Sequence, residues 1–195
     1  IQVAYDKRVD HYAHVSRFVL DLQTTPIHMG KQSVIYPGVD ADEFAFAPTR
    51  RDPRTAGMVY RLTNDKINAD TIEILIKICK AVPDVLIYVI GDGPNLRHFI
   101  ERARRERVRQ NIVFTGFVPY ERLSEYYEAF NVFLAPVHHE SYGVVVPYAM
   151  FKGNPVVAFQ VDAIEELLPD PNFRVVGSDD DFVATAVDVL QGTVR

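Results

Sequence analysis

Short apolar runs alternate with longer amphipathic segments along most of the chain. Several of these runs are continuously apolar rather than alternately apolar and polar, which is typical of parallel strands buried on both faces. The predicted strands are His11–Ser16, Ser33–Tyr36, Ala56–Leu62, Val85–Ile90, Ile112–Thr115, Val132–Ala135, Pro155–Phe159 and Phe173–Val176.

The longer segments between these runs carry apolar residues at helical spacing. In the segment Ala69–Ala81, one apolar stripe is formed by Ile72, Leu75, Ile76 and Cys79. The other predicted helices are Asn95–Arg107, Tyr120–Phe130, Gly143–Phe151, Ile164–Leu168 and Asp179–Leu190. Repeating strand–helix–strand units predict a doubly wound, Rossmann-like α/β fold, in which a mostly parallel sheet has helices on both faces.

The beginning of the chain follows a different pattern. A short helix, Ser16–Leu22, is predicted after the first strand, and the later stretch SVIYPGVDADEFAFAP is typical of a strand that leads into an irregular, proline-containing connector. We interpret the residues before about Asp52 as an approach to the main domain rather than as part of its core.

Composition places the chain among globular proteins. Its 195 residues, 48% apolar and 24% charged, suit one domain with or without an extension. The net charge of -5 gives no general reason to expect nucleic acid or an anionic membrane surface as a partner. The single cysteine, Cys79, cannot form an internal disulfide, which fits a reducing compartment. Its apolar neighbours predict that Cys79 is a core residue.

Targeting signals are not visible in the sequence. No apolar run is long enough to cross a bilayer, and no signal peptide is recognisable. We therefore expect a cytoplasmic location, with peripheral association with a membrane as an open alternative. The chain begins with Ile1 rather than Met, which suggests a fragment of a longer protein.

The turns after the strands are the candidate sites, because ligands of open parallel sheets bind beyond the carboxyl ends of the strands. These turns are RLTNDK, Gly91–Pro94, Gly116–Pro119 and Pro136–Gly143. Arg61 and Lys66 in the first turn could place two cations on one rim, which suits a diphosphate. A helix that starts at Gly143 would add free backbone N–H groups and the positive end of a helix dipole. Together these elements predict a phosphate site that needs no metal.

Other charged and metal-binding residue types have simpler interpretations. His138 and His139 are adjacent, but no third ligand lies at a useful spacing, so no metal site is predicted. The basic segment Arg102–Arg109 is interpreted as a solvated helix face, partly paired with Glu101 and Glu106, in preference to a surface for a phosphate-rich partner.

Five segments carry, in this order and spacing, a resemblance to a known family: YRLTNDK, VIGDGP, IVFTGFVP, VFLAPVHHESYGVVVPYAM and GNPVVAF. They resemble the C-terminal, nucleotide-sugar-binding half of family-four retaining glycosyltransferases, which have the two-domain GT-B fold. SRFVLDL and SVIYPGVDADEF resemble the end of the N-terminal domain and the interdomain linker. The resemblance thus assigns residues 1–50 to that end and linker, and residues 51–195 to a donor-binding domain.

The resemblance also implies a role for each matching residue. Arg61 and Lys66 would bind the donor diphosphate, and Glu140, the first glutamate of an E-x7-E motif, would contact the donor sugar. These three are the predicted catalytic residues. The predicted donor-binding residues are Phe117 and Val118 beside the base, Gly143, Val144 and Val145 with their amides toward the phosphate, and also Tyr142 and Tyr148.

Tyr148 stands where the family has its second glutamate, which usually grips the ribose hydroxyls. A phenol cannot give the bidentate, charged acceptance that a carboxylate offers to a ribose diol. Three interpretations stay open: Tyr148 contacts an altered donor, ribose binding has weakened, or the ring packs against the sheet. Other departures are Tyr60 in place of a usual glycine, Pro147 in the first turn or so of the helix, and Val161–Ala163 in place of paired glycines.

The resemblance implies a retaining glycosyltransferase, which transfers a sugar from a nucleoside-diphosphate-sugar to an acceptor hydroxyl. The nucleotide-sugar is a substrate, and no cofactor or metal is expected. The acceptor, whether glycan, lipid or small molecule, is left open, and a missing N-terminal domain would supply the other wall of the active site. We therefore expect the 195 residues alone to bind donor without catalysing transfer.

Alternative functions remain open from the sequence. One is a non-catalytic nucleotide-sugar-binding or scaffold module of the same fold, which the departures such as Tyr148 favour. Another is a GT-B sugar-nucleotide epimerase, whose activity would not depend on an acceptor. A flavodoxin-like signalling domain would need an acidic pocket at the strand ends, whereas these turns carry Arg61 and Lys66.

Overall fold

A six-stranded parallel sheet forms the centre of the protein in the computed structural model, which describes residues 8–22, 30–40, 42, 51–168 and 173–193. Its strands are β3 (Thr55–Val59), β4 (Leu86–Ile90), β5 (Ile112–Gly116), β6 (Val132–Ala135), β7 (Val156–Phe159) and β8 (Arg174–Val176). They lie in the order β5-β4-β3-β6-β7-β8, and each pairs in parallel with its neighbours. After β5 the chain returns to the other side of β3, so β3 and β6 flank the crevice where such sheets bind ligands.

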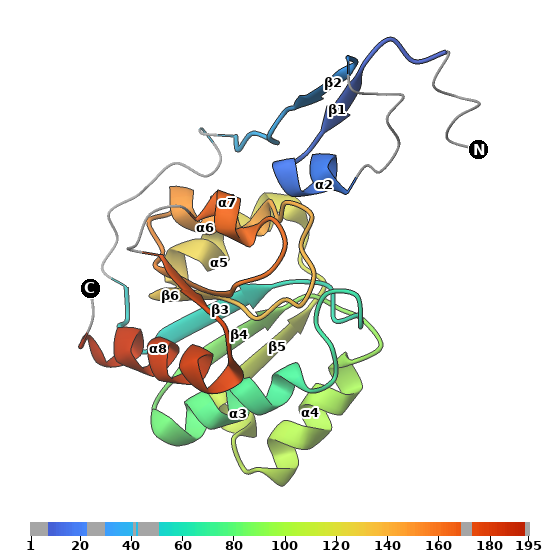
Figure 1. The fold of residues 1–195 in the computed structure, drawn as a ribbon. Helices are drawn as coiled ribbons and strands as arrows, with labels where there is room; N and C mark the ends of the chain where they lie inside the picture. Colours follow the sequence, from blue (N-terminus) through green and yellow to red (C-terminus); the bar gives the residue numbers. More distant parts are fainter. Residues whose placement is uncertain (1–7, 23–29, 41, 43–50, 169–172, 194–195) are drawn as a thin grey trace.

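Helices cover both faces of this sheet. They are α3 (Thr71–Ala81), α4 (Leu96–Arg105), α5 (Leu123–Ala129), α6 (Val145–Phe151), α7 (Ile164–Leu167) and α8 (Asp179–Gln191), with 3-10 turns η2 (Arg109–Asn111) and η3 (Tyr120–Arg122). Figure 1 shows α3, α4 and α8 on one face and α5, α6 and α7 on the other. The predicted doubly wound α/β fold is confirmed.

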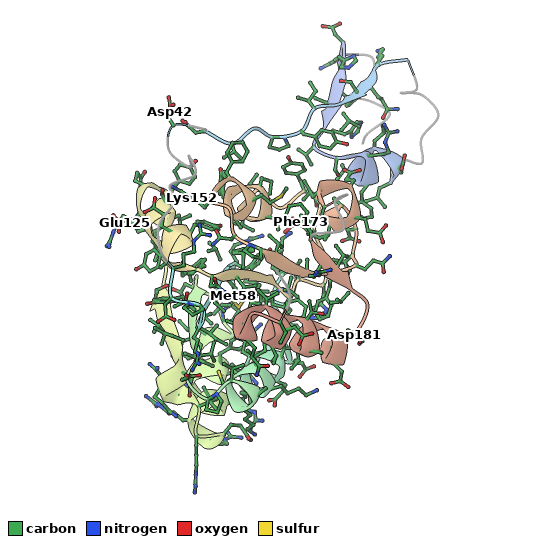
Figure 2. The ribbon with its side chains drawn as sticks, turned by 90° about the vertical axis from the view of Figure 1, so that its left-hand side faces the viewer. Asp42, Met58, Glu125, Lys152, Phe173 and Asp181 are labelled. Atoms are coloured by element: carbon green, nitrogen blue, oxygen red, sulfur yellow. The ribbon has the colours of Figure 1, made fainter. Side chains whose placement is uncertain are left out.

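The core lies between these layers, which explains why the strands are apolar throughout. Every residue of β3, β6 and β7 is buried, and Met58 of β3 lies in the middle of the domain in Figure 2. Cys79 on α3 is a buried free thiol, as its apolar neighbours predicted. In the basic segment, Arg102 pairs with Glu106 and with Glu73, whereas Glu101 pairs with Arg97.

Some predicted bounds are wrong by one to three residues. Helix α6 begins at Val145 rather than at Gly143, because Gly143 has a φ of +80° and cannot belong to a right-handed helix. The helix predicted from Tyr120 starts with the 3-10 turn η3 and becomes α-helical at Leu123. The third predicted strand ends at Val59, before the turn that carries Arg61.

The N-terminal segment forms a small unit beside α7 (Figure 1). Strand β1 (Tyr12–His14) pairs in parallel with β2 (Gln32–Val34), and the helix α2 (Arg17–Asp21) lies between them in sequence. Ser16 caps α2, since its Oγ accepts a hydrogen bond from the Val19 amide. The predicted domain boundary at residue 50 lies outside the described residues. No helix in the described part of the chain is long and apolar enough to span a bilayer.

Candidate functional site

A cleft of about 670 Å³ opens beyond the carboxyl ends of β3 and β4. Its predicted members are Arg61, Lys66, Phe117, Val118, Glu140, Tyr142, Gly143, Val144 and Val145. These residues come from three different turns of the sheet, so the fold brings them together from positions far apart in the chain. Tyr148 is not among the residues that line this cleft.

An ion pair joins the two strands that flank the crevice. Lys66, in the turn after β3, donates from Nζ to Glu140 Oε1 at 2.9 Å and to the carbonyl of His139 at 3.1 Å. The Glu140 side chain is 7% exposed and that of Lys66 is 21% exposed. Because both groups are largely removed from water, each compensates much of the charge of the other, and Glu140 Oε1 also accepts from the Tyr142 amide at 3.4 Å.

Glu140 is held by its backbone as well as by Lys66. Its amide donates to Asp162 Oδ2 at 2.8 Å, and its carbonyl accepts from the Ala163 amide at 3.1 Å. Asp162 adopts a φ of +48°, which is rare for a residue with a side chain. The loop after β7 therefore fixes the backbone from which Glu140 projects, in the part of the sequence where paired glycines would be usual.

Gly143 lets the backbone pass closely over the Glu140 side chain. A Cβ atom on Gly143 would lie 2.7 Å from Glu140 Cγ and 2.8 Å from Cδ, and the φ of +80° is itself unfavourable for other residues. Helix α6 follows at once, with Val144 at its N-cap and no side chain that caps it. Pro147 is the third residue of α6, as predicted within the first turn, where a missing N–H costs little.

Arg61 lies at the rim of the cleft. Its side chain is 71% exposed, and its Nη2 is 3.4 Å from Oδ2 of Asp65 in the same turn. An exposed pair of this kind is worth little, about 0–1 kcal/mol, so the guanidinium can turn toward another anion at small cost. The cleft thus offers one firmly held cation, Lys66, and one adaptable cation at its edge.

The other half of the cleft is apolar. Phe117 follows Gly116, whose φ is +69°, and its ring is 77% exposed at the cleft. Val118, Leu123 and Val144 line the same side. A cleft lined by cations and also by an exposed aromatic ring and aliphatic side chains suits a ligand with an anionic part and a flat apolar part.

Tyr148 is half-buried and packs on neighbouring helical rings rather than on the sheet. Its ring meets that of Tyr127 edge-on at 6.4 Å and that of Tyr120 at 5.9 Å, measured between centroids. Tyr127 is fully buried, so these contacts direct Tyr148 onto α5 and η3. The geometry favours the packing interpretation of Tyr148, and a direct contact of Tyr148 with a donor remains a prediction.

Tyr142 belongs to the cleft but also ties it to the N-terminal segment. Its hydroxyl donates to the carbonyl of Pro37 at 3.1 Å, and its ring stacks on Tyr36 at 5.8 Å. Burial, followed by the nearby Tyr36 and Glu166, raises the pKa of the Tyr142 phenol. The cleft also includes Val15 and Pro37, which the sequence did not identify. The sequence pattern of the N-terminal segment does not show where this segment lies relative to the sheet.

Several more cleft residues had no predicted role in the site: Val59, Tyr60, Ile90, Gly91, Asp92, Leu123 and Ser141. Tyr60 is the aromatic residue among them. It is buried between the end of β3 and the ring of Phe133, at a centroid distance of 6.1 Å. Its signal in the sequence was the replacement of a usual glycine. Across the described residues, no group of three His, Cys, Asp or Glu side chains could hold a metal ion.

The family comparison agrees with this geometry. The family model for glycosyl transferases group 1 matches residues 53–192. The chain belongs to this family. A curated relative, a GDP-mannose-dependent α-(1-6)-phosphatidylinositol monomannoside mannosyltransferase of Mycolicibacterium smegmatis, is 30% identical over 178 residues, which cover 82% of this chain and 47% of the relative. A glycogen synthase of Mycobacterium tuberculosis is 27% identical, over 69% of this chain and 33% of its own length.

Solved structures share the fold of this group 1 glycosyl transferase chain. HepE of Anabaena, solved with UDP and glucose, superimposes with a TM-score of 0.81 at 17% identity, over 98% of this chain and 57% of that chain. The C-terminal domain of the glycosyl transferase LpcC of Francisella tularensis gives a TM-score of 0.70 at 23% identity, over 79% of this chain and 88% of that one. This chain spans less than half the length of the two curated relatives described above.

Proposed function

We propose that this chain is the donor-binding part of a retaining glycosyltransferase, which transfers a sugar from a nucleoside-diphosphate-sugar to an acceptor hydroxyl. The observation that carries the proposal is the meeting of Arg61, Lys66 and the Gly143 loop in one cleft, next to the buried carboxylate of Glu140. Two cations and a bare backbone suit a diphosphate, and the exposed ring of Phe117 suits a nucleotide base.

In this proposal the cleft acts by electrostatic stabilisation. Negative charge grows on the departing diphosphate as the bond from the sugar breaks, and the transition state resembles an oxocarbenium ion. Lys66 and Arg61 stabilise that charge, and Lys66 lies in the cleft beside Glu140 before the donor binds. Glu140 orients the sugar ring. Retention through attack on the same face of the sugar is what the resemblance implies.

The relatives support a nucleotide-sugar as the donor class. The mycobacterial mannosyltransferase is named as GDP-mannose-dependent, and the Anabaena structure contains UDP and glucose. These two proteins differ in both base and sugar, so the donor of this chain is proposed only as a nucleoside-diphosphate-sugar. The match over most of the LpcC C-terminal domain supports a donor-binding half, which would work opposite a second domain.

The test is a pair of substitutions in the complete protein, Arg61→Ala and Lys66→Ala. Each should lower kcat/KM for the donor by about 10- to 1,000-fold, the range of losses when a group that stabilises transition-state charge is removed. Lys77→Ala is the matched control, because Lys77 makes an exposed ion pair with Asp180, on α8 and outside the cleft. Turnover is measured as release of nucleoside diphosphate with UDP-, GDP- and ADP-sugars. Unchanged turnover in both variants would contradict the assignment.

A second candidate is a non-catalytic nucleotide-sugar-binding module, which the inward packing of Tyr148 favours. A tyrosine packed on Tyr127 and Tyr120 is not placed in the cleft to grip a ribose. Calorimetry with nucleoside diphosphates, followed by a transfer assay on the complete protein, separates the two candidates. Binding without transfer would favour the module, and turnover that does not require an acceptor would indicate an epimerase.

A further inference from the structure

The hydroxyl of Tyr60 is buried without a hydrogen-bond partner among the described residues. Tyr60 follows β3 directly and is only 7% exposed. Leaving a buried polar group unpaired costs about 1–3 kcal/mol, so native proteins rarely tolerate one without a reason. A phenylalanine would fill the same space without this cost. We therefore look for a state of the protein in which this hydroxyl has a hydrogen-bond partner.

Two groups interact electrostatically with the Tyr60 phenol, Tyr127 and Glu140, and of these Glu140 is the one that carries a charge. Tyr60 lines the same cleft as Lys66 and Glu140. Burial, and after it the negative charge of Glu140, raise the pKa of the Tyr60 phenol well above its ordinary value. The phenol thus stays protonated and can donate a hydrogen bond, and it lies within electrostatic reach of the carboxylate.

Donor binding would change the situation of Glu140. When a donor binds, we expect Lys66 to turn its ammonium toward the diphosphate, and this movement competes with its 2.9 Å contact to Glu140 Oε1. The carboxylate of Glu140 is 7% exposed, so water cannot easily replace the lost partner. A buried carboxylate left with only the Tyr142 amide, at 3.4 Å from Oε1, would take up a proton or move, and in either case it would no longer orient the sugar.

We propose that Tyr60 is a positioning residue, whose hydroxyl donates a hydrogen bond to the Glu140 carboxylate when Lys66 turns toward the donor diphosphate. Glu140 then exchanges one partner for another. It pairs with Lys66 before the donor binds, and it accepts a hydrogen bond from the Tyr60 hydroxyl afterwards. The role in donor binding rests on the proposed function. The exchange itself involves three side chains only, and it can be tested without any ligand.

The first test is a thermal-unfolding cycle on the complete protein with Lys66→Met, Tyr60→Phe and the double variant. With Lys66 present, Tyr60→Phe should leave the midpoint unchanged or raise it, because it removes an unpaired hydroxyl. In the Lys66→Met background Glu140 keeps only the Tyr142 amide, 3.4 Å from its Oε1, so Tyr60→Phe should lower the midpoint by about 3 °C. Such a reversal is not expected from a residue that only fills space. Equal effects in the two backgrounds would overturn the proposal.

The second test is calorimetric titration of the complete protein with UDP, GDP and ADP. Tyr60→Phe should lower the affinity for the best-binding of these nucleotides by about tenfold, which is the loss expected when one hydrogen bond to a charged group is removed. Unchanged affinity would overturn the exchange. If the unaltered protein binds none of the three nucleotides, the proposed function fails, and the thermal cycle alone decides the role of Tyr60. If Lys66→Met does not fold, the titration decides it.

Discussion

Because Lys66 and Glu140 are paired, substituting either residue has two effects: it removes that side chain and it leaves the charge of the other without its partner. Removing one partner of a buried ion pair leaves the other charge uncompensated, which costs about 3–5 kcal/mol when the pair is fully buried. Glu140 is the more deeply buried of the two. Lys66→Ala therefore removes a cation and also disturbs Glu140. A comparison of Lys66→Ala with the Lys66→Ala, Glu140→Gln double variant separates the two contributions.

Gly143→Ala should damage the site through Glu140. The new methyl group would lie 2.7 Å from Glu140 Cγ, and a positive φ costs other residues about 1–2 kcal/mol. We expect a fall in kcat/KM of about tenfold or more, with a loss of stability of about 1–2 kcal/mol. Gly177→Ala is the control, since a Cβ atom there meets nothing within 4 Å. Wild-type kinetics in Gly143→Ala would contradict the proposed importance of the Glu140 position.

The thiol of Cys79 should be unreactive in the folded protein. Burial raises its pKa to about 12, because the apolar surroundings disfavour the thiolate. At pH 8 the reactive thiolate would then be on the order of 10⁻⁴ of the total. A disulfide reagent should modify the thiol in denaturant within minutes and leave the native protein unmodified over the same time. Rapid modification of the native protein would show that α3 opens readily.

Single residues were predictable from the sequence where the chemistry is local. Arg61 and Lys66 were identified because they follow a strand, and both line the cleft. The direct contact of Lys66 with Glu140 was not predictable, because the two residues are 74 positions apart and meet only through the β3–β6 pairing. The orientation of Tyr148 depends on the rings of α5 and η3, which no spacing in the sequence reveals.

At the scale of elements, strands were predicted more reliably than the ends of helices. A strand buried on both faces needs apolar side chains at every position, as in β6 and β7, and this pattern is visible in the sequence. The beginning of α6 depends instead on the backbone conformation of Gly143, and the same glycine in another turn would adopt another φ. The sequence therefore predicts the sheet well and the loop that shapes the cleft less well.

The turn after β4 packs against the end of β3 through Gly91. A Cβ atom on Gly91 would lie 1.9 Å from the carbonyl oxygen of Tyr60, which belongs to the backbone and cannot move aside. Gly91→Ala should destabilise the protein by about 2–4 kcal/mol, from backbone strain and overpacking together. Denaturant unfolding measures the loss.

Gly116→Ala provides the control for Gly91→Ala. Gly116 also has a positive φ, of +69°, but a Cβ atom on it meets nothing within 4 Å. The substitution Gly116→Ala should therefore lower the free energy of unfolding only by the strain of the left-handed conformation, about 1–2 kcal/mol. Equal losses in the two variants would mean that the close approach of the two turns is not what stabilises this edge of the cleft.

At the scale of the whole molecule, the loop that carries Glu140 is tied to the N-terminal segment. Ser16 Oγ donates to the carbonyl of Ser141 at 2.5 Å, and the Arg17 amide donates to Glu166 Oε1 at 2.8 Å. Strands β1 and β2 form a two-stranded parallel sheet, with Ile35 exposed beside it. Parallel sheets are usually covered on both faces, and the assignment of this unit to the end of an N-terminal domain and a linker stays a prediction.

The openness of the cleft leads to a prediction for the isolated chain. Arg61 is 71% exposed and Phe117 is 77% exposed, so a ligand here would keep one side in water. Water weakens the attraction between a cation and a diphosphate severalfold, and electrostatic catalysis depends on its exclusion. A second wall would change the rate of transfer more than the affinity for the diphosphate, because the cations proposed to bind the diphosphate, Arg61 and Lys66, are both in this chain.

We therefore expect the isolated 195 residues to bind a nucleoside diphosphate within about tenfold of the affinity of the complete protein, but to transfer sugar at least about 100-fold more slowly. Calorimetry and a transfer assay on both proteins measure the two quantities. Lys66→Ala in the isolated chain is the control, since it should abolish whatever binding the cleft provides. Transfer by the isolated chain at the full rate would mean that this cleft excludes water by its own closure, without a second domain.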